Sequence, residues 1–241
     1  MKPHASLLVE LAIPILALSV VTLVGVAIVK TSRRRDLTWF AGGAVLWLLA
    51  SALLAQSGVL ASYESLPPRF LLLMLPSLGL PLVLAFSRVG RALEGELPLG
   101  AIVLFQGFRF PLELVMHRAA QEGTMPPQMA FSGYNFDIVT GVSALIVGSL
   151  ALLGRAPRWL IWAWNALGTT TLVTILAIAV ASLPQFAAFG SEPARLNTWI
   201  AYFPFVWLPA GLVGSAVLGH VILWRRLLSR GMRGRALAAI S

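Results

Sequence analysis

A group of polar side chains interrupts the fourth of the long apolar segments in this chain. Gln106, Arg109, Glu113 and His117 follow one another at intervals of three or four residues. Because a helix turns by about 100° per residue, all four side chains lie within an arc of about 80° on one face. Arg109 and Glu113 are four residues apart, so they can form an ion pair that lowers the cost of burying either charge. We expect this face to point into the protein interior or toward a water-filled cavity.

Three further polar residues are predicted at the same depth. Asn135 and Asp137 begin the fifth apolar segment, and Glu10 lies near the start of the first. Buried ionisable groups in a membrane are costly, and their convergence predicts a polar, water-accessible pocket open toward the outer face. The predicted ligand-binding residues are Gln106, Arg109, Glu113, His117, Asn135 and Asp137.

Each of these residues also has a structural interpretation, which the sequence leaves open. Asn135 or Asp137 would satisfy free backbone N–H groups as a helix cap. Arg109 and Glu113 would fix the register of two helices without binding anything. Glu10 would extend to the membrane surface, and His117 would be an exposed or hydrogen-bonded surface residue.

Asn165 and His220 form a second, smaller polar set, which we predict toward the inner side as a hydrogen bond between helices. Along the helices His117 and His220 would be some 20 Å apart, too far to share a metal ion or a haem. One mixed site built from His117, Glu113, Asp137 and His4 stays open, but no metal and no cofactor are predicted. The chain has no cysteine, which excludes thiolate chemistry, and its two lysines lie outside the apolar segments.

The elements that position these residues follow from composition. Of 241 residues, 58% are hydrophobic and 11% are charged, against about 25% charged in an ordinary soluble domain. Segments of about 17–25 apolar residues are long enough to cross a bilayer. The sequence therefore predicts an all-α, polytopic membrane protein with a single domain over residues 1–241. The seven expected spans are 6–29, 39–60, 70–87, 97–117, 136–153, 159–183 and 199–224.

The basic residues predict how these spans are oriented. Cytoplasmic loops collect Lys and Arg. If the N-terminus lies outside, the inner segments carry 13 of the 18 basic residues and the outer segments carry four, with Arg109 inside the membrane. The net charge of +9 thus indicates orientation, with the C-terminus in the cytoplasm, and no nucleic-acid partner is expected.

Several short motifs resemble those of a group of small bacterial heptahelical membrane proteins. The similarity extends from about residue 60 onward, and it implies a multi-pass protein of the bacterial inner membrane without transferring any catalytic residue. The motifs are Ser65-Leu-Pro-Pro-Arg69, Phe110-Pro-Leu-Glu113, Asn135-Phe-Asp137, Trp164-Asn-x-Leu-Gly168 and Phe203-Pro-Phe-Val-Trp-Leu-Pro209 followed by His220.

Three functions fit these features. The first is a binding or transport protein for a small polar or amphipathic ligand, with Arg109 holding an anionic group. The second is a structural or accessory subunit of a membrane complex, paired with another protein or with copies of itself. The third is an intramembrane hydrolase or transferase for a lipid-linked substrate, with Glu113, Asp137 or His117 as acid or base. Whether the protein is an enzyme stays open.

Overall fold

The structure is a computed structural model that describes residues 3–63, 65 and 68–238, with side chains up to residue 229. Several residues used in the predictions above fall outside this part of the chain. They are Lys2, Glu64, two residues of the motif at 65–69, and the side chains of Arg230, Arg233 and Arg235.

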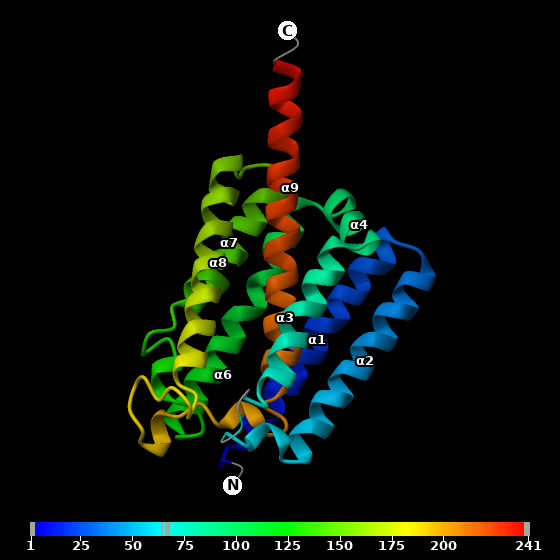
Figure 1. The fold of residues 1–241 in the computed structure, drawn as a ribbon. Helices are drawn as coiled ribbons and strands as arrows, with labels where there is room; N and C mark the ends of the chain where they lie inside the picture. The colour runs from blue at the N-terminus through cyan, green and yellow to red at the C-terminus, as the bar shows by residue number, and fades with distance from the viewer. Residues whose placement is uncertain (1–2, 64, 66–67, 239–241) are drawn as a thin grey trace.

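All regular elements in the described residues are helical, and the two chain ends lie at opposite ends of the bundle (Figure 1). The α-helices are α1 (Leu7–Thr31), α2 (Arg34–Gln56), α3 (Leu71–Phe86), α4 (Arg88–Glu96), α5 (Leu99–Phe105), α6 (Arg109–Gln121), α7 (Asp137–Leu152), α8 (Arg158–Ala181) and α9 (Gly214–Ala238). Short 3₁₀ turns join them, and a π-helix, η6 (Leu208–Val213), precedes α9.

Five of the helical stretches in the described residues are long and apolar enough to cross a membrane: Leu7–Thr31, Arg34–Gln56, Leu99–Gln121, Arg158–Ala181 and Leu208–Ser229. A sixth candidate is the pair α3 and α4, which bends by 66°. The bend follows Ser87, whose Oγ accepts a hydrogen bond from the Gly90 amide and so caps α4. The remaining apolar helix, α7, has 16 residues and is shorter than these.

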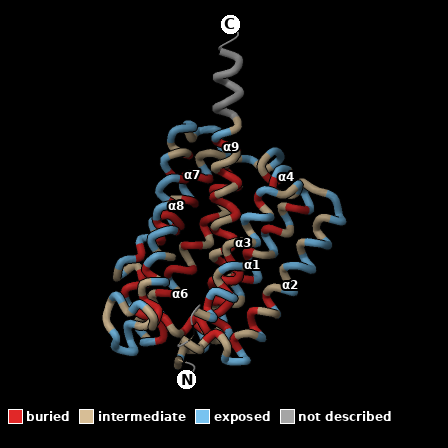
Figure 2. The backbone as a smooth tube through the Cα atoms, viewed as in Figure 1, coloured by how far each residue is buried: buried red, intermediate tan, exposed pale blue. Residues whose placement is uncertain are grey.

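The outer surface of the bundle is apolar, as expected for contact with lipid. The most apolar 18-residue stretch of α2 carries few charges, yet only 17% of it is buried inside the protein. Most of its apolar side chains therefore face outward. Trp39 and Leu46 on α2 are 74% and 70% exposed, and Val83 on α3 is 71% exposed. Figure 2 shows the same pattern, with buried positions facing the bundle axis and exposed ones on the outer sides of the helices. A multi-pass membrane protein accounts for this distribution.

The last span begins later than predicted. The sequence predicts a helix from residue 199, but Trp199–Ala201 form an isolated 3₁₀ turn and the continuous helix starts at Leu208. Pro204 and Pro209 lack the N–H groups that a regular helix would use here. The π-helix η6 leaves backbone groups without α-helical partners, and the indole of Trp47 donates to the Ala210 carbonyl at 3.1 Å.

The fourth predicted span differs in another way, because a 3₁₀ turn at Gln106–Phe108 divides it into α5 and α6. Its α5 part packs closely on α7 through glycines. A Cβ atom on Gly148 would come within 2.7 Å of the Leu104 backbone nitrogen, and one on Gly100 within 2.6 Å of the Gly148 carbonyl oxygen. These contacts fix α6, which carries Arg109 and Glu113, against the start of α7, which carries Asp137.

The end of α6 is tied to the start of α1. The Ser6 amide donates to Oε2 of Glu122 at 2.8 Å, and Arg118 donates to Oε1 at 2.6 Å. These bonds favour the charged carboxylate and lower the pKa of Glu122 to about 2. The contact closes the N-terminal end of the bundle next to the polar residues of α6.

Candidate functional site

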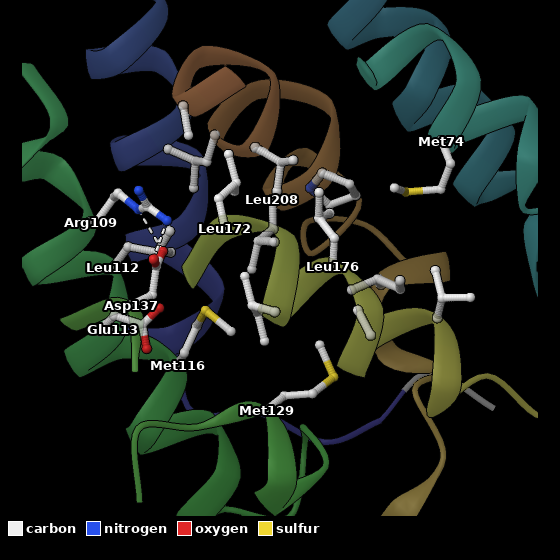
Figure 3. A pocket seen from close by; sticks show the side chains of 18 of the residues that line it. Met74, Arg109, Leu112, Glu113, Met116, Met129, Asp137, Leu172, Leu176 and Leu208 are labelled. Carbon is white, nitrogen blue, oxygen red and sulfur yellow. Dashed lines mark hydrogen bonds and ion pairs between the residues drawn. The ribbon is translucent and has the colours of Figure 1, made fainter. Parts of the chain in front are cut away.

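The centre of the site is an ion pair between Arg109, the first residue of α6, and Asp137, the first residue of α7. Arg109 Nε donates to Asp137 Oδ2 at 2.5 Å, and Nη2 donates to Oδ1 of the same carboxylate. Both residues are buried, and Figure 3 shows the guanidinium directed at the carboxylate. At 1.5 Å per residue, Arg109 lies about 15 Å from Leu99, near the middle of the 23-residue stretch Leu99–Gln121. A bidentate pair of this kind satisfies two donors and two acceptors at once.

The same guanidinium also contacts α8 and α9. Its Nη1 donates to the Gly168 carbonyl oxygen at 3.3 Å and lies 2.8 Å from Nε2 of His220. A Cβ atom on residue 168 would come within 2.5 Å of His220 Cε1, so a glycine is required at this contact.

Geometry determines which nitrogen of His220 carries its proton. A guanidinium only donates hydrogen bonds, so Nε2 of His220 accepts from Arg109. Nδ1 lies 2.7 Å from Oδ1 of Asn165, an acceptor, and therefore carries the proton. The Asn165 amide is oriented by its own contact with the His220 carbonyl oxygen at 3.4 Å. His220 is thus a neutral imidazole in this arrangement.

Glu113 is held separately, one turn further along α6. Nδ2 of Asn135 lies 2.9 Å from each Glu113 carboxyl oxygen and also donates to the Met129 carbonyl at 3.0 Å. Oδ1 of Asn135 accepts from the Asp137 amide at 3.0 Å, which fixes the first turn of α7. One asparagine therefore links the Glu113 carboxyl group to the backbone of Asp137.

The charges of this network do not balance. Arg109 neutralises Asp137 and His220 is neutral, but Glu113 is 1% exposed and its amide neighbour, Asn135, carries no charge. A buried carboxylate without a counter-charge costs several kcal/mol. Glu113 therefore requires a proton or a cation.

A cavity of about 60 Å³ adjoins these three charged residues. Arg109, Glu113 and Asp137 lie together on one side of it, and apolar side chains, mostly from α3, α6, α8 and η6, form the rest of its wall (Figure 3). Met74 on α3 and Leu176 on α8 line it from different elements, and Val180, also in the wall, is 39% exposed. The cavity thus joins the charged group to the apolar exterior between α3 and α8.

Two of the predicted site residues lie elsewhere. His117 stacks on Phe131 with ring centroids 4.3 Å apart, and its ring nitrogens contact Gln121 and Ser132. Gln106 is buried, but its amide donates to the Ala216 carbonyl at 2.9 Å. Gln106 and Arg109 therefore both contact α9, but at different points: Gln106 at Ala216 and Arg109 at His220.

The partners of the charged residues differ from those expected. The carboxylate held by Arg109 is Asp137, not Glu113, because the side chain of Arg109 points across to α7 instead of along α6. The hydrogen bond predicted between Asn165 and His220 is confirmed. The prediction that these two form a separate set is wrong, since His220 contacts Arg109 directly.

The sequence did not indicate the apolar residues that line the cavity or the backbone carbonyl that contacts Arg109. Met74, Leu176 and Leu208 line the cavity, but their types are the same as those of residues that face lipid. Gly168 contributes a carbonyl oxygen, and the sequence shows only its Trp164-Asn-x-Leu-Gly168 motif.

In the described part of the chain, no three His, Cys, Asp or Glu side chains come together as ligands for a metal ion, so the mixed site of His117, Glu113, Asp137 and His4 does not form there. No protein-family model matches this sequence, and no curated protein or solved structure is significantly similar to it.

Proposed function

We propose that the chain crosses the bacterial inner membrane seven times, with its N-terminus outside and its C-terminus in the cytoplasm. The five long candidate spans and the bent pair account for six crossings, and we assign the seventh to the shorter apolar helix α7. Opposite positions of the two termini support an odd number (Figure 1). The end of the bundle near the C-terminus also carries most of the described basic residues: Lys30, Arg33, Arg34, Arg35, Arg88, Arg91, Arg155, Arg158, Arg225 and Arg226.

Because the chain has no cysteine, single cysteines can test this orientation. Ser191 is exposed in the connection after α8, and Gly95 on α4 has open space around it. In intact cells, a membrane-impermeant maleimide is expected to label Ser191→Cys, whereas Gly95→Cys reacts only after the cells are permeabilised. The reverse pattern would invert the topology, and labelling of both in intact cells would contradict seven crossings.

We propose that the protein binds or transports a small amphipathic molecule that enters from the membrane. The cavity beside Arg109, Glu113 and Asp137 carries this proposal, because it presents charged groups at one side and an apolar wall toward lipid. Sites for small molecules commonly combine an apolar lining with a few convergent polar groups. A cavity of about 60 Å³ suits a polar head of a few atoms, since a water molecule needs at least about 10–15 Å³.

Filling the cavity provides the test. In Leu176→Trp, an indole replaces a half-buried side chain of the cavity wall. Wild-type protein purified in mild detergent is expected to retain an amphipathic molecule, detected by native mass spectrometry, and Leu176→Trp to lose it. Leu114→Trp is the control, because Leu114 on α6 is 47% exposed and lies outside the cavity. The same bound molecules in all three proteins would contradict the proposal.

A structural role is the second candidate, and the internal hydrogen bonding of Arg109 favours it. Three of its nitrogen atoms already have partners on α7, α8 and α9. Such a network would hold four helices together for assembly with another protein or with further copies of the chain. This role would be favoured by two results together: Leu176→Trp retains the same bound molecules as the wild type, and mutation of Arg109 causes the loss of a partner complex.

The enzymatic alternative has less support. His117 lies against Phe131 and Ser132, whereas Asp137 is engaged by Arg109, so the two do not face one reacting point.

A further inference from the structure

We infer that the molecule bound in the cavity is an amphipathic cation, and that it exchanges with a proton on Glu113. This inference rests on the proposed binding function and specifies the charge of its ligand.

The first argument concerns Arg109, which is a poor site for an anion. Its Nε and Nη2 donate to Asp137, and its Nη1 is shared between the Gly168 carbonyl and His220. An anion would have to displace Asp137 from a buried bidentate pair, leaving that carboxylate without a partner. The charge of Arg109 is therefore already used inside the protein.

The second argument concerns Glu113, which lines the cavity and has no counter-charge of its own. Its hydrogen bonds come from the uncharged amide of Asn135. A primary or substituted ammonium group placed in the cavity would supply the missing positive charge and make charge-assisted hydrogen bonds to the carboxylate. In the empty cavity, a proton on Glu113 removes the same imbalance.

Among the titratable groups around α6, we assign the pairing with the cation and the proton exchange to Glu113. Asp137 on α7 is paired with Arg109, and His220 on α9 is held as a neutral imidazole. On α1, which also packs on α6, Glu10 lies in the first turn. Glu113 is the group of this set that both lines the cavity and has only an amide for a partner.

The exchange itself is a proton transfer without any redox step. When the ammonium group enters, the O–H bond of the protonated Glu113 breaks and its proton goes to water, while the carboxylate pairs with the cation. When the cation leaves, a proton from water returns to the carboxylate. Binding is thus expected to release about one proton per site, whichever side of the membrane supplies it.

The chain of the ligand would lie in the apolar opening between α3 and α8. Met74, Leu176 and Val180 line this opening, so an alkyl chain would remain partly in lipid while its head reaches Glu113. A long-chain alkylammonium fits this arrangement better than a compact polar ion, because the cavity itself holds only a small head.

The test uses two probes with the same chain length and opposite charge, dodecylammonium and dodecanoate, with the protein in nanodiscs of uncharged lipid. We expect saturable binding of radiolabelled dodecylammonium above that of empty nanodiscs, with release of about one proton into a weakly buffered solution. Glu113→Gln keeps a neutral side chain of the same shape and is expected to lower the affinity for dodecylammonium at least tenfold and abolish proton release. The matched change Glu192→Gln, at an exposed surface residue, should alter neither.

The outcomes separate this inference from the proposed function. Binding of dodecanoate that Leu176→Trp abolishes, without binding of dodecylammonium, would overturn the inference about charge and leave the binding function standing. Binding of dodecylammonium without proton release, or unchanged binding to Glu113→Gln, would overturn the exchange. If neither probe binds above the level of Leu176→Trp, the inference fails, and the co-purification experiment decides the binding function separately.

Discussion

Asp137→Asn is expected to destabilise the bundle by about 3–5 kcal/mol, the range for removing one member of a buried ion pair. The substitution leaves Arg109, which is 1% exposed, without its counter-charge in the middle of the bundle. The carboxylate also anchors the first turn of α7, so the loss is expected to affect the contact between α6 and α7 first. The free energy of unfolding in mixed detergent micelles, measured by circular dichroism, checks the expected change.

The same experiment has an internal control in a double variant. Arg109→Met combined with Asp137→Leu removes both charges, and replacing a buried pair by apolar residues is often neutral or stabilising. We expect the double variant to recover most of the stability lost in Asp137→Asn. If the losses simply add, the pair is not a coupled unit and the interpretation of its burial is wrong. Glu192→Gln, an exposed carboxylate, should change the unfolding free energy little.

Gly148→Ala is expected to destabilise the protein by about 1–3 kcal/mol, the usual range for overpacking. The new methyl group would lie 2.7 Å from the Leu104 nitrogen and 2.8 Å from its Cα, both backbone atoms that cannot rotate away. α5 and α7 would have to separate, which shifts α6 relative to Asp137. Unfolding in mixed micelles measures the stability, and bound dodecylammonium measures the effect on the cavity.

Gly43→Ala is the matched control for this substitution. Gly43 also lies inside a membrane span, α2, but a Cβ atom there would meet nothing within 4 Å. Alanine favours the helix over glycine by up to about 1 kcal/mol, so this variant is expected to be as stable as the wild type or slightly more so. Equal destabilisation in both variants would show that the stability lost in Gly148→Ala does not come from the contact between α5 and α7.

The spans were predictable because lipid selects long apolar segments, and the segment around α2 is an example. Its residues are apolar although few of them are buried, so hydropathy detects it without any knowledge of packing. The start of the last span was not predictable in this way. Residues 199–207 are as apolar as the helix that follows them, and only Pro204 and Pro209 indicate that the backbone is irregular there.

For the charged residues, the sequence indicates which of them are important but not which of them pair. Arg109, Glu113 and Asp137 stand out because charges are rare inside membrane spans, and their place near a cavity could be expected. The pairing of Arg109 with Asp137 could not be predicted, since a helix wheel compares residues of one helix and Asp137 lies on α7. The contact of His220 with Arg109 could not be predicted either, because the sequence predicts the last span from residue 199 whereas its helix begins at Leu208.

The π-helix before α9 also determines the direction in which the side chains of α9 point. A π-helical turn accommodates one residue more than an α-helical turn, and each residue corresponds to about 100° of rotation. Without that extra residue, the side of α9 that carries His220 would rotate by about 100° away from Arg109. The six residues Leu208–Val213 therefore set the rotation of α9 about its axis, and this rotation determines whether His220 reaches the buried network.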